Sequence, residues 1–176
     1  IEAKMVQPDE DNMLAVCTYM TKVALDARII DPEAEEYDGG KVALCAEKII
    51  DINKAIPGTA QAVFCDTNTP KKNAFSVYQA LRERLVRSDE FAENEIAFVH
   101  DAANDKQRLA MFERVNNAEI KIIIGSTGKL GTGVNIQRKL SALHHLDAPY
   151  RPSDIEQRNG RGIRQGNENS EVYIGY

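Results

Sequence analysis

Three arginines at a fixed spacing stand out late in the chain, in the stretch DIEQRNGRGIRQG at residues 154–166. On a helix, Arg158, Arg161 and Arg164 would lie on roughly one face, where side chains of the same charge repel one another. Two interpretations are open. Either solvent screens three ordinary surface charges, or the segment faces a strongly anionic ligand, which a planar and always protonated guanidinium binds well.

The distribution of charge favours a local anion site. The 176-residue chain carries a net charge of −5, which argues against a protein whose whole surface binds nucleic acid. Residues 1–60 hold 12 acidic and 6 basic side chains, whereas residues 120–166 hold 8 basic and 3 acidic ones. A positive strip on an acidic body indicates a defined anion site rather than general affinity for polyanions.

Composition is that of an ordinary globular protein, with 43% hydrophobic and 28% charged residues. No apolar run reaches membrane-spanning length and no signal-peptide pattern opens the chain, so we expect a cytoplasmic protein without a membrane partner. The first residue is Ile1 rather than Met, which indicates a fragment or a processed product. Cys17, Cys45 and Cys65 have apolar neighbours and no CxxC pairing, so we expect reduced core residues and no metal site.

Apolar periodicity divides the chain into two parts. In residues 12–30 apolar side chains recur every three or four positions (Met13, Val16, Met20, Val23, Ala27 and Ile30), and residues 41–56 repeat the pattern. Both stretches are predicted to be helices with core-packing faces. The rest alternates expected strands at 61–66, 96–99, 120–125, 142–147 and 171–176 with expected helices at 73–85, 104–115 and 153–163, the last begun by Ser153. This alternation predicts a three-layer α/β domain, a parallel sheet with helices on both faces.

Two nucleotide-binding motifs are matched only in part. GSTGKLGTG, at residues 125–133, follows an expected strand as a P-loop does. The first glycine of that motif is replaced by Ile123, and the hydroxyl residue that would bind magnesium is replaced by Leu130. GTGVNI and GRGIRQ each lack the third glycine of a dinucleotide-binding fingerprint. The chain therefore has no phosphate-binding loop of either kind.

A different set of motifs fits better. QRNGRGIR, at residues 157–164, resembles motif VI of superfamily-two helicases at every fixed position, and STGKLGTGVN, at 126–135, resembles motif V. Between them, a strand ending in Asp and an aromatic-x-Pro step resemble the Swi/Snf-like branch, with Tyr150 where that branch usually has Trp. The closest resemblance is to the Swi/Snf-like helicase segments of large methylase-helicase proteins of bacterial mobile elements.

This resemblance implies a RecA-like fold and a role as the second lobe of an ATP-dependent DNA helicase or translocase. Residues 61–176 would form the lobe, and residues 1–60 a helical extension packed on it. ATP with Mg²⁺ would be held mainly by a first lobe of the same parent protein, so the chain alone would be inactive. DNA, duplex rather than single-stranded, would be the other partner.

The resemblance also assigns roles to single residues. Catalytic groups would be Arg161 and Arg164 as arginine fingers, with Gln157 orienting beside them. Gly133, Asn135 and Arg158 would be the cofactor-binding residues, although Arg158 is better suited to tying motif VI to neighbouring structure. The phosphates of nucleic acid would be contacted by Ser126, Thr127 and Lys129.

Other interpretations remain open from sequence. The chain could be a nucleic-acid or partner-binding module with a degenerate helicase fold and no coupling to ATP, or a small-molecule α/β enzyme. Ser126 and Thr127 could cap a turn. His144 and His145 fall mid-strand on opposite faces, where packing is the expected role, and Asp147 is expected to tie down its loop. We expect Thr127, Asn135, Arg161 and Arg164 along one edge of the sheet, because ligands gather at the carboxyl ends of parallel strands.

Overall fold

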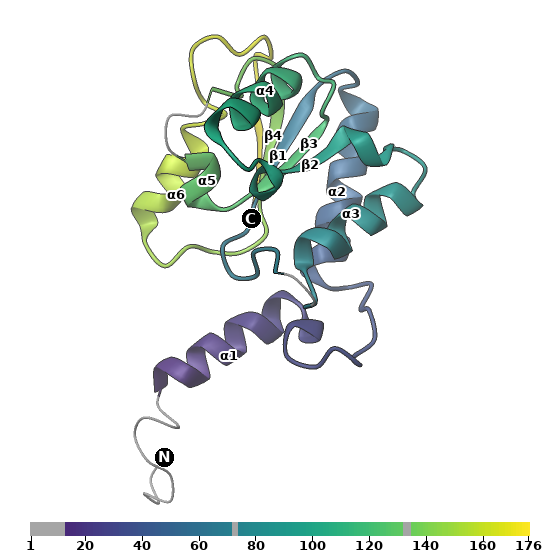
Figure 1. Ribbon diagram of the computed structural model, residues 1–176, viewed down its shortest axis with the longest axis vertical. Coiled ribbons are helices and arrows are strands. Elements are labelled where there is room, and N and C mark those ends of the chain that lie inside the picture. Colours follow the sequence, from purple (N-terminus) through teal and green to yellow (C-terminus); the bar gives the residue numbers. More distant parts are fainter. Residues whose placement is uncertain (1–12, 72–73, 132–134) are drawn as a thin grey trace, which may run out of the picture.

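Five parallel strands form the centre of the molecule, in the order β2-β3-β1-β4-β5 (Figure 1). This computed structural model describes residues 13–71, 74–131 and 135–176. The strands are β1 (Ala60–Phe64), β2 (Ile96–Phe98), β3 (Ile122–Gly125), β4 (Leu140–His145) and β5 (Tyr173–Gly175). The helices are α1 (Met13–Leu25), α2 (Lys41–Ala55), α3 (Val77–Arg87), α4 (Asp105–Asn116), α5 (Thr127–Gly131) and α6 (Pro152–Asn159). The predicted parallel α/β sheet is confirmed.

The strands are apolar on both faces because both faces are covered. Along β1, Val63 faces a core cluster built with α2 and α3, whereas Ala62 and Phe64 face a second cluster built with α4 and Leu130 of α5. Alternate side chains of a strand point to opposite faces, so an uninterrupted apolar run is what a doubly covered strand requires. The three predicted layers are therefore confirmed, with α2 and α3 on one face and α4 and α5 on the other (Figure 1).

Local sequence signals account for the start of α4 and the end of α2. The side chain of Asn104 accepts a hydrogen bond from the backbone N–H of Gln107 at 2.9 Å, so it caps α4 as expected. α2 ends just before Pro57, and Gly58 follows in a left-handed conformation that suits glycine. α6 differs from the prediction of a helix at 153–163. It begins with Pro152 at its first turn rather than with Ser153, and it ends at Asn159.

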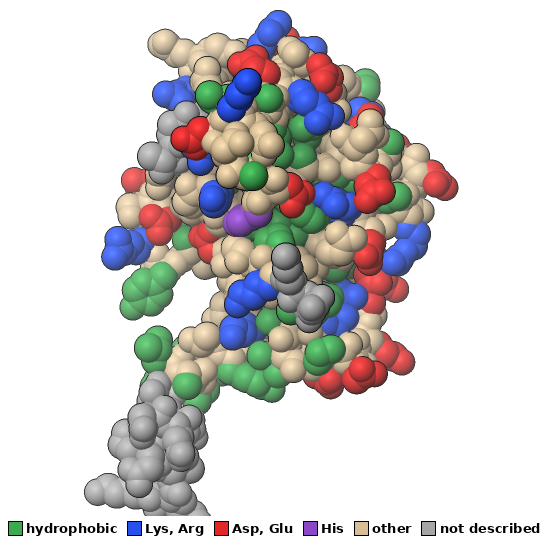
Figure 2. All heavy atoms as spheres, viewed as in Figure 1, with side chains coloured by type: hydrophobic (Ala, Val, Ile, Leu, Met, Phe, Trp, Pro, Cys, Tyr) green, Lys and Arg blue, Asp and Glu red, His purple; other side chains and the backbone are tan. Residues whose placement is uncertain are grey.

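The prediction for α1 is wrong in one respect. Its apolar stripe was expected to pack on the core, but Met13 and Met20 are 65% and 63% exposed and only Leu25 is buried. The helix projects from the body of the molecule, and hydrophobic side chains lie at the surface over it (Figures 1 and 2). Cys17 is exposed with them, whereas Cys65 is buried as expected. Periodicity revealed the helix but not what covers it.

α2 is part of the layered body. Val42, Ala46 and Ile49 lie in the core, and Gln61 of β1 donates from its side chain to the backbone oxygen of Ile49 at 2.9 Å. A division of the chain at residue 60 stays a prediction, and α2 packs against the sheet on the N-terminal side of that division. None of the helices that the structure describes is long and apolar enough to cross a membrane.

Candidate nucleotide and nucleic-acid site

The ends of three neighbouring strands bring distant polar residues together. Phe64 at the end of β1 pairs with Gly125 of β3 and with His145 of β4. The residues that follow each strand therefore meet at one edge of the sheet, as the carboxyl ends of parallel strands do. Asp66, Thr127 and Asp147 come together there, from segments about 60 and 80 residues apart in sequence.

Arg158 of α6 lies at the centre of this cluster and hydrogen-bonds to all three residues. It is fully buried, and its five N–H groups meet five acceptors. Nε donates to Thr127 Oγ1 at 2.7 Å. One Nη donates to the backbone oxygen of Asp147 at 2.8 Å and lies 3.3 Å from His145 Nδ1. The other Nη donates to the carboxylate of Asp66 at 2.7 Å and to that of Asp147 at 3.2 Å. All of its N–H groups are engaged within the protein in this structure, and a role of Arg158 in cofactor binding stays a prediction. Its alternative role, tying motif VI to its surroundings, is the one that this geometry supports.

Asp66 joins two helices through one carboxylate. Oδ1 accepts the backbone N–H of Thr127 at 2.7 Å, and Oδ2 accepts both the Thr127 hydroxyl at 2.6 Å and Arg158 at 2.7 Å. Partial burial works to raise the pKa of Asp66, but hydrogen bonds from Thr127 and Arg158 outweigh it and hold the pKa below its ordinary value. Sequence reasoning missed this residue. The one signal for it was a polar segment directly after a buried strand.

Asp147 has the structural role expected of it, with a different loop as its target. Its second oxygen accepts the backbone N–H groups of Asp66 at 2.7 Å and Thr67 at 2.6 Å, and also the Thr67 hydroxyl at 2.7 Å. It therefore ties down the loop that follows β1 rather than its own. Because Arg158 holds Asp147 as well, the carboxylates of Asp66 and Asp147 share one guanidinium.

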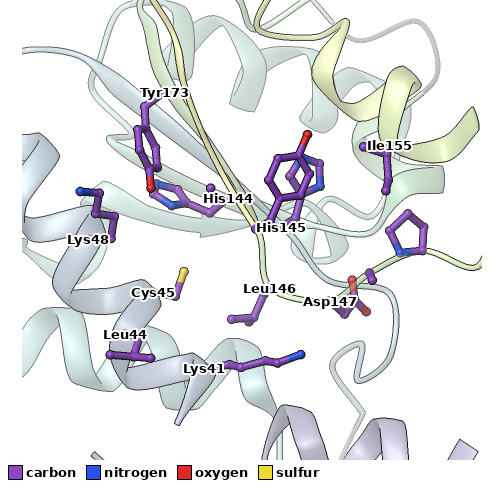
Figure 3. Close-up of a pocket in the computed structure, with 14 residues that line it drawn as sticks. Lys41, Leu44, Cys45, Lys48, His144, His145, Leu146, Asp147, Ile155 and Tyr173 are labelled. Atoms are coloured by element: carbon purple, nitrogen blue, oxygen red, sulfur yellow. The ribbon is translucent and has the colours of Figure 1, made fainter. Parts of the chain in front are cut away.

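The two histidines of β4 face opposite sides of the sheet and pack, as predicted. His145 stacks between Phe64 and Tyr176, with ring centroids 5.8 and 4.9 Å away. On the other side, His144 Nε2 lies 2.8 Å from the side-chain oxygen of Gln61, and burial lowers the pKa of His144 to about 4. Figure 3 shows both rings beside a pocket of about 320 Å³ between α2 and the last two strands. None of the predicted site residues lines it.

Arg161 and Arg164 lie beyond the end of α6, in the turns that follow it. The backbone between them passes close to the sheet at Gly162, where an added Cβ would lie 3.0 Å from side-chain atoms of Leu143 and Val172. The backbone therefore approaches the sheet closely at this glycine. Leu143 is in the middle of β4, so the backbone at Gly162 lies against the sheet at mid-height rather than at its carboxyl edge.

The surroundings of Arg161 are unlike those of Arg158. Arg161 is partly buried, and its Nε has no hydrogen-bond acceptor among the described residues. Burial lowers the pKa of Arg161, and the positive charge of Arg164 lowers it further, which places the two guanidiniums within electrostatic reach of each other. A pair of cations held in this way provides a place for an anion with several charged oxygens.

The remaining predicted residues are spread along the loop after β3. Ser126 and Thr127 are partly buried and Lys129 is exposed at the carboxyl edge. Asn135 is exposed, and its backbone oxygen accepts from Asn116 near the end of α4, which leads into the opposite edge of the sheet. The expectation that Thr127, Asn135 and both arginines share one edge is therefore wrong. Gly133 lies outside the described residues, and Gln157 is exposed on α6.

A polar edge of this kind, on a parallel sheet of this strand order, agrees with a family match. The model of the helicase conserved C-terminal domain matches residues 41–166. The chain belongs to this family. The match begins at the first residue of α2 and covers every residue of the Arg158 cluster as well as Arg161 and Arg164.

In the described ranges, no three His, Cys, Asp or Glu side chains gather closely enough to hold a metal ion.

Solved structures agree on the fold of this helicase-family chain. The C-terminal part of the Fun30 ATPase domain has a TM-score of 0.57 and 16% identity, over 89% of this chain and 48% of that one. The DUF1998 helicase MrfA, solved bound to DNA, has a TM-score of 0.53 and 15% identity, over 74% of this chain and 17% of that one. At such identities the likeness shows the fold alone, which is the RecA-like fold of helicase C-terminal lobes.

A curated relative shares a stretch of sequence. The defense against restriction protein B of Escherichia phage P1 is 41% identical to this chain over 54 residues, which are 31% of this chain and 2% of that protein. The chain therefore spans a small part of the length of this relative and about half the length of the Fun30 chain.

Proposed function

We propose that this chain is the second motor lobe of an ATP-dependent DNA helicase or translocase of the Swi/Snf-like branch, within a large methylase-helicase protein of a bacterial mobile element. In this proposal Arg161 and Arg164 reach the γ-phosphate of ATP that a first lobe holds together with Mg²⁺. The observation that carries it is the state of Arg161: partly buried, beside a second cation, with an Nε that has no acceptor among the described residues. We also place the protein in the cytoplasm. The thiols of Cys17, Cys45 and Cys65 are free, and cytoplasmic proteins keep their thiols reduced.

The arrangement of Arg161 beside Arg164 costs free energy in the absence of a ligand. Two like charges held near each other are unfavourable, and a buried N–H without an acceptor costs free energy as well. A phosphoryl group in transfer spreads negative charge over its equatorial oxygens and offsets both costs at once. Gln157 lies in the last turn of α6, four residues before Arg161, and is exposed, which suits an orienting role beside the arginines. Asn135 is exposed and keeps its side-chain amide for a ribose hydroxyl, with Gly133 in the same segment.

The nucleic-acid side of the proposal lies at the start of α5. Phosphate oxygens accept hydrogen bonds but donate none, and both donors of Thr127 are used by Asp66. Thr127 therefore contributes by fixing the position of Ser126 and Lys129, which offer a hydroxyl and an ammonium group to the backbone of a DNA strand. Contacts of that kind hold a strand without reading its sequence. The DNA named for the MrfA structure agrees with this class of partner.

The test uses the protein that carries both lobes. Arg161→Ala and Arg164→Ala should each lower DNA-stimulated ATP hydrolysis by about 10³- to 10⁵-fold, the range found for arginine fingers. Arg87→Ala is the matched control, since Arg87 is an exposed arginine on α3, which covers the other face of the sheet, and its variant should stay within about twofold. If the Arg161 and Arg164 variants keep most of their activity, the chain is a binding module with a degenerate helicase fold.

A further inference from the structure

We infer that Asp66 is a positioning residue that couples the DNA side of this lobe to its arginine fingers. The inference rests on the proposed function and adds to it a residue that no motif assigns. Asp66 stands at the only point in the described structure where one side chain holds both the first residue of α5 and Arg158 of α6. Through it, the two functional segments of the lobe share a single carboxylate.

The two ends of this connection lead to the two proposed sites. On one side, Asp66 binds the N–H and the hydroxyl of Thr127, which lies between the proposed phosphate contacts Ser126 and Lys129. On the other side, it binds Arg158, and the backbone N–H of Arg161 donates to the backbone oxygen of Arg158 at 3.1 Å. Arg158 also donates directly to the Thr127 hydroxyl at 2.7 Å, so α5 reaches the finger segment through Thr127 and Arg158, and Asp66 holds these two residues in place from one carboxylate.

A closed ring of hydrogen bonds makes the connection stiff. Asp66 accepts from Arg158, Arg158 donates to the carboxylate of Asp147, and Asp147 accepts from the backbone N–H of Asp66. Arg158 and Asp147 are buried, so neither side chain can exchange these partners for water. Connected hydrogen bonds in a site of low dielectric strengthen one another, and displacement of one member is felt by the rest.

Asp66 is the member of the ring that solvent and DNA can reach. Its side chain is 38% exposed, compared with 4% for Asp147 and none for Arg158. The residue is therefore placed where a strand crossing the start of α5 can perturb it, while its partners transmit the effect inward. A role confined to stability would not require the exposed position, because Asp147 already holds Arg158 from the buried side.

The negative charge is what Asp66 contributes. Both of its oxygens accept, and three donors converge on them. In Asp66→Asn one oxygen becomes an NH₂ group, which opposes an N–H or O–H donor wherever it is placed. Charge-assisted bonds are about twice as strong as neutral ones, so this substitution loosens both ends of the connection while keeping the size of the side chain.

The test compares DNA-stimulated with basal ATP hydrolysis in the two-lobe protein. Asp66→Asn should lower the ratio of stimulated to basal kcat by about 5- to 150-fold, the range of typical coupling between sites, with KM for ATP within about twofold of wild type. Asp101→Asn is the matched control, an exposed carboxylate in the turn after β2 that should leave the ratio unchanged. An equal loss of basal and stimulated rates, or an unchanged ratio, would overturn the inference.

Variants of Thr127 supply a second, independent measurement. Thr127→Ser keeps the hydroxyl that donates to Asp66 and accepts from Arg158, and should retain the wild-type ratio. Thr127→Val removes the hydroxyl at nearly constant volume and should lower the ratio as Asp66→Asn does. The double variant should be no worse than either single one, because residues of one network are not additive. Additive losses would contradict the inference, whereas full ATPase activity in Arg161→Ala would instead remove the proposed function on which it rests.

Discussion

Arg158 and Arg161 are three residues apart in one motif, and their surroundings are opposite. Arg158 is fully buried with an acceptor for each of its five N–H groups. Arg161 is partly buried beside Arg164, with an Nε that has no acceptor among the described residues. The helix ends at Asn159, between them, so they do not share a helical face.

The two arginines of this motif differ in whether the protein itself neutralises their charge. Two carboxylates from distant loops neutralise Arg158, and its charge is consumed in holding the edge of the sheet together. No salt bridge found in the described residues neutralises Arg161, and the proposed function assigns its charge to the phosphates of a nucleotide. Within this row of equally spaced arginines, Arg158 is bound on all sides by the protein itself, whereas Arg161 keeps an Nε without an acceptor among the described residues.

The largest expected effect is on stability at Arg158. In the isolated chain, Arg158→Ala should lower the free energy of unfolding by about 3–5 kcal/mol, because it leaves two carboxylates without their cation and a cavity in their place. Urea denaturation followed by circular dichroism measures it. Arg161→Ala is the matched control and should change the same quantity by less than about 0.5 kcal/mol. Similar losses for the two variants would remove the distinction between these arginines.

Acid should lower the free energy of unfolding through His144, by somewhat less than Arg158→Ala does. His144 is buried with its pKa lowered to about 4, whereas an unfolded histidine has a pKa of about 6.5. Above pH 6.5 His144 is neutral in both states and costs no stability. As the pH falls toward 4, the unfolded state binds the proton first, and the free energy of unfolding drops by about 3 kcal/mol at most. Denaturation curves at several pH values should show this loss in wild type and in Arg161→Ala. In His144→Gln the slope between pH 6.5 and 4 should be smaller, and an unchanged slope would contradict the assignment.

Gly162 should give the smallest of the three effects on stability. It is the point where the backbone between Arg161 and Arg164 rests on the sheet, and a Cβ there would lie 3.0 Å from side-chain atoms of Leu143 and Val172. Gly162→Ala should cost about 1–3 kcal/mol in the free energy of unfolding, the usual range for overpacking. Gly128→Ala is the control, since nothing lies within 4 Å of its added Cβ. A loss no larger than that of the control would show that this contact is loose.

The sequence predicted the layers of the fold because local signals and the core agree. Short apolar runs marked the five strands, Asn104 marked the start of α4, and Pro57 and Gly58 marked the end of α2. The exposed face of α1 could not be predicted, because apolar spacing reports a helix face and not its neighbour. The short helix α5 was also missed, since its start depends on a cap supplied by Asp66 from a segment about 60 residues away.

The candidate site was predictable to a lesser extent, for a related reason. The motif pattern pointed to Arg161 and Arg164, but their place in the turns beyond α6 follows from the end of that helix at Asn159 and from the close packing at Gly162. The partners of Arg158 come from the loops after β1 and β4, and only the pairing of the strands brings them together. Tertiary contacts, which spacing does not encode, decided which arginine is structural.

The central claim is that this lobe supplies cations to a nucleotide held elsewhere, and the most direct measurement uses the purified 176-residue chain. A fluorescent ATP analogue is titrated in the presence of Mg²⁺, and phosphate release is followed with and without duplex DNA. We expect no turnover and only feeble nucleotide binding, because guanidiniums that remain open to water gain little from a phosphate without a second surface to exclude solvent. Micromolar affinity or steady turnover would contradict it, since the site would then be complete within this chain.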